Sequence, residues 1–282
     1  MKLKKTHNGN TNLHLWTYGN IYELVYHCKD ADEWNNIIFC VYPYPDTAVA
    51  RTRDIRKGIP YADNTFEHIV VTRVIEHLTL DENKIFLLEL HRVLCPNGII
   101  RFSTPDLTQK VQTYIDTYDQ YKLDPTEANY NSYHWAVLDL NDQSSRNHSG
   151  GLMLPTARSG MVSKSDMRAS SGDVMDYILA GKKPPVTKPH NSVMSVLYGI
   201  VRSIIYMIKG THPHTTREAN MWMYDQSILR DVLVEAGFGS VSTKDYHTSD
   251  IADYNRYAWD TSPHGDYDVE PSLYIEALKP IK

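Results

Sequence analysis

A glutamate and a histidine stand together shortly after an apolar run in the sequence. The run is EHIVVTR at residues 67–73, and the pair is Glu76-His77. A histidine titrates close to neutral pH, so His77 could take a proton from a hydroxyl group as a general base. Alternatively, the two residues only cap the helix that follows and hold the wall of a pocket. The residues themselves leave both interpretations open.

A second set of polar residues lies on YHWAVLDLNDQSSRNHSGG, at residues 133–151. If residues 133–146 are helical, His134, Asp142 and Arg146 are spaced by eight and four residues and roughly share one face. Asp142 is then a second candidate for the base, and His134 and Arg146 are candidate contacts for a sugar or phosphate acceptor. The alternative is a solvated ion pair between Asp142 and Arg146 that contributes little.

Two further stretches complete the set of candidates. The run NLHLWTYGN, at residues 12–20, is typical of a buried strand that enters a ligand-binding loop, with Gly19 and Asn20 as the backbone that faces the ligand. Late in the chain, Tyr224 is a candidate for the wall of the acceptor site. Its neighbour Asp225 is expected to be the N-cap of a helix over residues 225–236.

The elements that must position these residues form a strand–helix–strand unit. Residues 67–73 and 99–104 read as strands, and residues 81–94 read as an amphipathic helix with Asp81 as its N-cap. Such a unit belongs to a parallel sheet with a right-handed crossover. Ligands bind at the carboxyl ends of the strands in open sheets of this kind, so the residues directly after each strand are the candidates for the site.

The rest of the chain fits one domain over residues 1–282, with a lobe over residues 107–220 that covers this edge of the sheet. Helices are expected within the lobe, followed by an irregular lid over residues 148–190, rich in Gly, Ser, Lys and Pro. The remaining expected elements are a strand at 36–42, helices at 107–121 and 126–143, and a hairpin pair of strands at 240–247 and 272–279.

Composition excludes several classes of function. The net charge of −5 gives no basic field for nucleic acid. The three cysteines form no CxxC pair and no HExxH motif occurs, so no metal site is expected. The longest apolar run, residues 193–208, is shorter than a spanning helix. It favours a buried helix or peripheral membrane contact, and the N-terminus lacks a signal peptide, so we expect a cytoplasmic protein.

The order of several motifs resembles that of a known family. The motifs are, in chain order, DIRKGIPYADNTFEHIVVTRVIEHL, LELHRVLCPNGIIRFSTPDL, MWMYDQSILRDVLVEAGF and SLYIEALKP. Over roughly residues 50–150 and 219–280 the chain resembles class I S-adenosylmethionine-dependent methyltransferases of the type 11 branch, as found among polysaccharide and lipopolysaccharide biosynthesis proteins. The resemblance implies a three-layer, Rossmann-like α/β sandwich with a mostly parallel sheet and an antiparallel strand near the end.

The resemblance also implies roles for individual residues. Asp54 matches the acidic position near the cofactor's adenine, and Arg73 to His77 match the segment that lines its methionine side. The first loop departs from the family, because LHLWTYGN has one glycine where the family has several. Tyr42 stands where the family carries an acidic residue that binds the ribose, and a phenol cannot match a carboxylate's bidentate grip.

Two functional hypotheses follow. The first is an enzyme that transfers a methyl group from S-adenosylmethionine to an oxygen of a sugar or a sugar-linked phosphate in surface-glycan biosynthesis. The second is a methyltransferase-like protein with a degenerate cofactor loop that has lost the cofactor and acts as a binding or scaffold partner in the same pathway. The expected partner is a small-molecule or glycan acceptor, and the assembly, whether monomer or homodimer, stays open.

Overall fold

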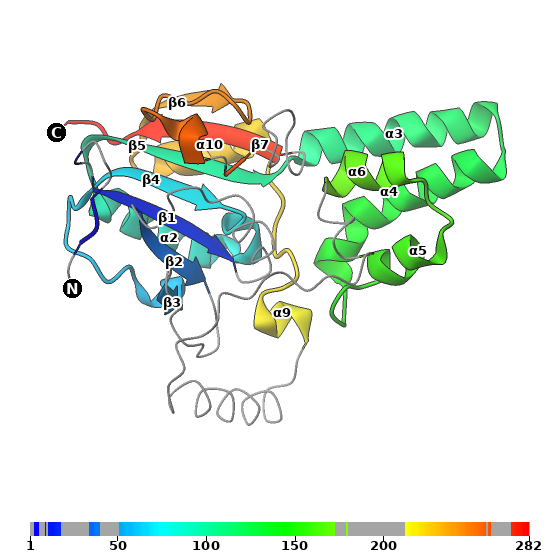
Figure 1. Cartoon of the computed structure of the whole chain (residues 1–282), viewed down its shortest axis with the longest axis horizontal. Helices are drawn as coiled ribbons and strands as arrows, with labels where there is room; N and C mark the ends of the chain where they lie inside the picture. The colour runs from blue at the N-terminus through cyan, green and yellow to red at the C-terminus, as the bar shows by residue number, and fades with distance from the viewer. Residues whose placement is uncertain are drawn as a thin grey trace.

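The computed structural model describes residues 3–5, 9, 11–17, 34–39, 51–172, 179, 212–257, 259–260 and 272–281. Its centre is a seven-stranded sheet in the order β3-β2-β1-β4-β5-β7-β6. Helices flank this sheet, and a helical lobe lies beyond one end of it (Figure 1). The strands are β1 (Asn12–Thr17), β2 (Asn35–Phe39), β3 (Arg51–Arg53), β4 (Phe66–Thr72), β5 (Leu94–Pro105), β6 (Gly239–Lys244) and β7 (Ser272–Leu278).

The direction of the strands follows the expected α/β class. The first five strands along the chain pair in parallel, while β7 pairs antiparallel with both β5 and β6. The mostly parallel sheet and the late antiparallel pair are therefore confirmed. Because β1 and β4 are central neighbours, their carboxyl ends bring Thr17 and Thr72 to the same edge of the sheet.

Helix α2 (Leu80–Val93) closes the expected strand–helix–strand unit, but it begins differently from the expectation. Thr79, not Asp81, is the N-cap. Its hydroxyl accepts from Glu82 N at 3.3 Å, and the Glu82 carboxylate accepts from Thr79 N at 2.9 Å. This capping box satisfies two backbone donors reciprocally, which a lone aspartate two residues later cannot do.

The apolar side chains of the sheet point alternately to its two faces, so the core has two layers, one on each face. On one face, α2 and α10 (Gln226–Glu235) pack against Leu13, Leu15 and Ile100. On the other face, an aromatic cluster includes Trp34, Tyr254, Tyr257 and Trp259 and covers Val70. The segment between β6 and β7, with the short 3-10 helix η5 (Tyr254–Tyr257), supplies much of this second layer.

Strand β5 begins at Leu94, five residues before the expected start at residue 99. It starts directly after α2, and Cys95 to Gly98 lie inside it, where the pairing with β4 shifts register. Asn97 adopts a left-handed φ of 61° at this irregularity. The breaker residues thus end the helix and also form a bulge, which is a common use of Pro and Gly in strands.

The lobe begins at the carboxyl end of β5 (Figure 1). Helices α3 (Leu107–Leu123) and α4 (Glu127–Ser145) are close to their expected bounds. The expectation of an irregular segment after residue 148 is wrong in part, because α5 (Met153–Ser159) and α6 (Lys164–Ser171) occur there. Their apolar residues join Trp135 and Leu138 of α4 in a separate small core. No helix within the described ranges is long and apolar enough to cross a membrane.

Candidate functional site at the carboxyl edge of the sheet

The chain turns sharply after β4, at the centre of the edge. Arg73 adopts a left-handed φ of 53°, its backbone N–H donates to Ser103 O at 2.9 Å, and its guanidinium donates to Ser272 Oγ at 2.6 Å. Such a φ costs on the order of 1–3 kcal/mol for a side-chain-bearing residue. Bonds to β5 and β7 hold this strained turn, which directs the short 3-10 helix η4 (Ile75–His77) over the strand ends.

Glu76 and His77 lie in η4, but neither caps α2, since Thr79 does so. Glu76 is buried, and its carboxylate accepts from Thr104 Oγ1 at 3.3 Å. The backbone oxygen of Glu76 also accepts from Met221 N at 2.6 Å. The glutamate therefore joins the ends of β4 and β5 to a segment that returns from the lobe.

His77 is fixed in one tautomer by its contact with this returning segment. Its Nδ1 lies 3.3 Å from Ala219 O. A carbonyl oxygen only accepts, so Nδ1 carries the hydrogen and Nε2 keeps its lone pair. Burial lowers the pKa of His77 to about 4, with smaller lowering effects from Arg73 and Arg146. The ring is neutral at pH 7 and able to accept a proton at Nε2.

Asp54 follows β3 at the same edge and is the N-cap of the 3-10 helix η3 (Ile55–Lys57). Its two carboxylate oxygens accept from Arg56 Nε at 2.8 Å and Arg56 Nη2 at 2.9 Å. Arg56 also pairs with Glu82 at 3.2 Å. Oδ1 also accepts from Arg56 N at 3.3 Å, so the carboxylate orders its own turn and only Oδ2 retains a lone pair for a further donor such as an adenine amino group.

The three site residues predicted on helix α4, His134, Asp142 and Arg146, lie in two separate places. Asp142 and Arg146 form the expected i,i+4 ion pair at 3.1 Å, and Arg146 also lies 3.4 Å from Glu218. The Asp142 carboxylate is buried and accepts from Leu152 N at 2.6 Å, at the start of α5. His134 instead stacks on Tyr130, with ring centroids 5.9 Å apart. The structure does not bring His134 to the Asp142–Arg146 pair.

Tyr224 is part of the main core. Its side chain is 1% exposed, and Asn83 Nδ2 donates to its hydroxyl at 2.8 Å. Burial, and next the charge of Glu76, raise the pKa of this phenol. The neighbouring Asp225 is the N-cap of α10, as predicted, and accepts from Ile228 N at 2.8 Å.

The strand that enters the predicted cofactor loop ends in buried polar groups. Within the described part of the chain, Trp16 Nε1 and Thr17 Oγ1, at the carboxyl end of β1, have no hydrogen-bond partner. Orphaned donors at this position fit a ligand that accepts hydrogen bonds there. The predicted contacts Gly19, Asn20 and Tyr42, and the apolar run 193–208, lie outside the described residues.

Two features of the site region have no signal in the local sequence. The first is residues 212–222, which we call the strap; it starts with α9 (Pro213–Thr216; Figure 1) and continues to the carboxyl edge of the sheet, where Met221 N donates to Glu76 O. The strap carries Arg217, Glu218 and Ala219, each of which contacts a distant element. Their partners are far away in the chain, so spacing could not reveal them.

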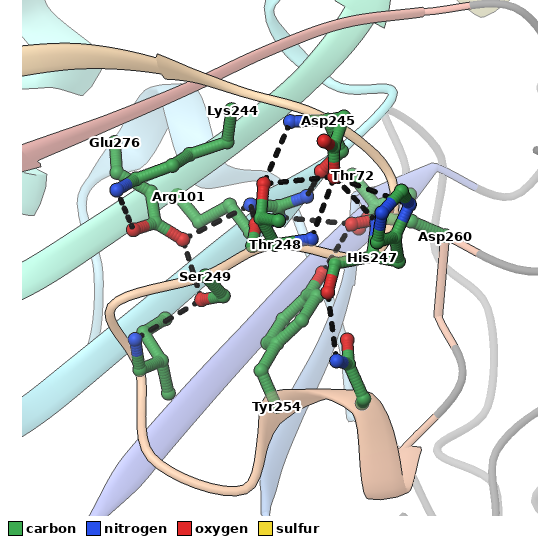
Figure 2. A network of polar contacts seen from close by, with 12 residues as sticks. Thr72, Arg101, Lys244, Asp245, His247, Thr248, Ser249, Tyr254, Asp260 and Glu276 are labelled. Atoms are coloured by element: carbon green, nitrogen blue, oxygen red, sulfur yellow. Dashed lines mark hydrogen bonds and ion pairs between the residues drawn. The ribbon is translucent and has the colours of Figure 1, made fainter.

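The second is a buried polar network, shown in Figure 2, on the face of the sheet that carries the aromatic cluster, opposite to α2 and α10. Arg101 of β5 is fully buried and pairs with Asp260 at 2.9 Å and Glu276 at 3.0 Å. Tyr254 also donates to Asp260. No cluster of three His, Cys, Asp or Glu side chains in the described part of the chain is arranged to hold a metal ion.

Comparison with known proteins adds a family relationship for part of the chain. Residues 35–102 match a family model described as a methyltransferase domain. This match covers β2 to β5 and does not include β1. No curated protein matches the sequence. The matched residues span about a quarter of the chain and are similar to a methyltransferase domain.

Several solved structures resemble the chain at low identity. A chain of the complex between the Haloferax volcanii Trm112 methyltransferase activator and a methyltransferase is 10% identical, with a TM-score of 0.40 over 100% of this chain and 86% of that chain. A SAM-dependent methyltransferase from Methanosarcina mazei is 9% identical, with a TM-score of 0.40 over 100% and 95%.

A third such structure is Haemonchus contortus phosphoethanolamine N-methyltransferase 2 in complex with S-adenosyl-L-methionine. It is 8% identical, with a TM-score of 0.35 over 99% of this chain and 50% of that chain. Because these TM-scores are low, the fold assignment rests on the strand order and register described above.

Proposed function

We propose that this protein transfers a methyl group from S-adenosylmethionine to an oxygen of a sugar or a sugar-linked phosphate. The observation that carries the proposal is the set of polar groups at one edge of the sheet. Asp54 after β3, Glu76 and His77 after β4, and Thr17 at the end of β1 all lie at carboxyl ends of parallel strands, where open sheets of this class bind ligands. The methyltransferase-domain match supports the cofactor.

The residues present fit that cofactor. Asp54 would accept from the adenine amino group through Oδ2, which keeps a lone pair beside Arg56. The orphaned Thr17 hydroxyl and Trp16 indole would donate to the amino-acid end of the ligand. Gly19, Asn20 and Tyr42 are proposed as further contacts, with Arg73 and Glu76 shaping the wall through the turn after β4. Bound S-adenosylmethionine would supply a methyl group activated by the sulfonium.

His77 is the base that we assign to the reaction. Its Nδ1 donates to Ala219 O, so the Nε2 lone pair is the group that can take the proton of an acceptor hydroxyl. Asp142 is less suited, since its carboxylate is already occupied by Arg146 and by the backbone of α5. Asp142 therefore holds the lobe together, and Arg146 stays the proposed anion contact for a sugar-linked phosphate.

A sugar acceptor is supported by the aromatic surface of the lobe. Helices α3 and α4 face each other through tyrosines whose rings stack or tilt against one another; these are Tyr114, Tyr118, Tyr121, Tyr130 and Tyr133. Tyr118 and Tyr130 are also exposed. A tyrosine offers an apolar ring face and a polar hydroxyl, which suits the mixed surface of a sugar. His134 stacks on this series and is proposed as part of the same surface.

The test is methyl transfer from radiolabelled S-adenosylmethionine to a panel of hexoses, deoxyhexoses and sugar phosphates. We expect label in an alkali-stable sugar ether or a phosphate methyl ester, and at least a tenfold loss of rate in His77→Gln, in line with the contribution of general-base catalysis. His148→Gln, which changes an exposed histidine of the lobe, is the matched control. Transfer to protein or lipid amines instead of sugars would contradict the acceptor class.

A further inference from the structure

One chain of ion pairs connects the proposed cofactor carboxylate to the strap that holds His77. Asp54 pairs with Arg56, Arg56 pairs with Glu82 at 3.2 Å, and Glu82 pairs with Arg217 of the strap at 2.6 Å. Both arginines reach the same oxygen, Glu82 Oε1. The other oxygen of Glu82 belongs to the capping box of α2. Glu82 therefore anchors the strap to the rigid start of a helix.

The strap is held from two sides. On the sheet side, Arg217 binds Glu82, and Met221 N donates to Glu76 O. On the lobe side, Glu218 binds Arg146 and accepts from Gly150 N at 3.0 Å. Ala219, whose carbonyl accepts from His77 Nδ1, directly follows the two ion-paired residues and precedes Met221. The position of this carbonyl thus depends on the contacts that hold the strap on either side of Ala219.

Arg217 occupies its place at a cost in backbone energy. It ends α9 with φ 61° and ψ 33°, in the left-handed region that residues other than glycine and asparagine seldom adopt. Its side chain is only 12% exposed, and that of Glu82 is 22% exposed, so their attraction is less screened than that of a surface pair. An ion pair in this position offsets the strain and directs the next two residues toward His77.

We propose that Arg217 and Glu82 are positioning residues that set the tautomer of His77 by holding the Ala219 carbonyl against its Nδ1. This inference rests on the proposed function of His77 as the base. Neither Arg217 nor Glu82 touches the imidazole; they act through the strap. If the strap moves away, Nδ1 loses its acceptor, water reaches the ring, and the hydrogen can move to Nε2, which removes the lone pair that the reaction needs.

Several charged groups other than Arg217 and Glu82 act on His77. Arg73 follows β4, Arg146 ends α4, and both lower the pKa of the ring, whereas Glu218 of the strap raises it. Glu76 is its neighbour in η4. Burial has the largest effect and lowers the pKa to about 4. Loss of the strap contact would therefore act chiefly by hydrating the ring, and the pKa would rise toward its ordinary value near 6.5.

The experiment is NMR of the full chain with 15N-labelled histidine, which reports both the tautomer and the pKa of His77. Two variants break the anchor and keep the local backbone. Glu82→Gln retains the capping box, because glutamine serves at that position. Arg217→Asn tolerates the left-handed φ. Arg217→Lys retains the charge. The control is Lys84→Gln, a change on the same helix as Glu82 that breaks an exposed ion pair with Glu235 of α10.

We expect the Nδ1–H tautomer in the wild-type protein and in Lys84→Gln. In Glu82→Gln and Arg217→Asn we expect an Nε2–H population and a pKa raised by about one unit or more, with partial recovery in Arg217→Lys. An unchanged tautomer and pKa in both anchor variants would overturn the inference, as would Nε2–H in the wild type.

The same samples are titrated with S-adenosylhomocysteine. Absence of binding in the wild type would contradict the proposed function. The inference about the tautomer is tested separately, because it depends only on the 15N spectra of the anchor variants. The two failures are thus distinguishable. If one of the two anchor variants unfolds, the other decides the inference, since both remove the same ion pair.

Discussion

Arg101 Nε donates to Asp260 Oδ2 at 2.9 Å, although the two residues are 159 positions apart in the chain. Both side chains are almost completely buried, and Glu276 takes a second bond from the same guanidinium. The arginine also donates to the backbone oxygens of Asp245 and Thr248 (Figure 2). This one side chain fastens the segment between β6 and β7 onto the second face of the sheet.

Replacing Arg101 with methionine should be strongly destabilising. The change removes the cation beside the buried Asp260 and leaves the buried Glu276 with only Lys244, 4.0 Å away, and removal of one partner of a buried pair costs about 3–5 kcal/mol. Urea unfolding monitored by tryptophan fluorescence measures the loss. The control is Lys84→Met, which removes an exposed pair and should change the free energy of unfolding by less than about 0.5 kcal/mol. If Arg101→Met lowers the free energy of unfolding by less than about 1 kcal/mol, the buried network does not stabilise the fold as described.

Gly151 is expected to tolerate no side chain. It has a φ of +51°, and a Cβ there would overlap the Asp142 carboxylate that accepts from the backbone of α5. Gly151→Ala should cost about 2–4 kcal/mol, from backbone strain and from the displaced buried acceptor.

Gly160 provides the matched control for that change. Its φ is +76°, but an added Cβ meets nothing within 4 Å, so Gly160→Ala carries strain alone. Limited proteolysis of the lobe and thermal unfolding compare the two variants. Equal stability of the two proteins would show that Asp142 does not hold the start of α5.

His14 should make the stability of the fold depend on pH. It is buried in β1, where it bonds to Thr72 Oγ1 at 3.0 Å and stacks on Trp259. Burial lowers its pKa to about 3, below the unfolded value of about 6.5. Between these values the unfolded chain binds a proton that the folded chain does not, so stability falls as the pH drops from about 6.5 toward 3.

The contribution of His14 is measured by urea unfolding at pH 7 and pH 5. His14→Gln retains a hydrogen-bonding side chain but does not titrate, so the loss of stability between these pH values should shrink by about 2 kcal/mol. His247, whose side chain is 58% exposed, is the control, and His247→Gln should keep the wild-type pH dependence. An unaltered pH dependence in His14→Gln would show that this ring is hydrated in the folded protein.

Local patterns predicted the elements that depend on neighbours in the chain. The apolar centre of EHIVVTR became β4, Asp225 capped α10, and the spacing of Asp142 and Arg146 produced their ion pair. Each of these depends on residues a few positions apart, for which periodicity and capping carry the information. The N-cap of α2 was misassigned, because a threonine with glutamate three residues later competes better than a single aspartate.

The remaining contacts depend on residues that are far apart, and no local spacing reveals them. Arg101 reads as a lone charge in an apolar strand until β7 and the segment after β6 place two acids beside it. Likewise, the carbonyl that orients His77 comes from Ala219, 142 positions later. Tyr224 was predicted at the wall of the acceptor site. In the structure its side chain packs in the main core, and its hydroxyl accepts from Asn83 Nδ2.

The account rests most directly on cofactor binding, which isothermal titration with S-adenosylhomocysteine measures. The prediction is a dissociation constant in the micromolar range, weakened about tenfold or more by Asp54→Ala, because a charge-assisted hydrogen bond contributes ~1.5–3 kcal/mol and ~1.4 kcal/mol is tenfold. Asp63→Ala, which removes an exposed carboxylate paired with Arg92, should bind as the wild type does. No heat and no thermal shift at millimolar ligand would contradict the account.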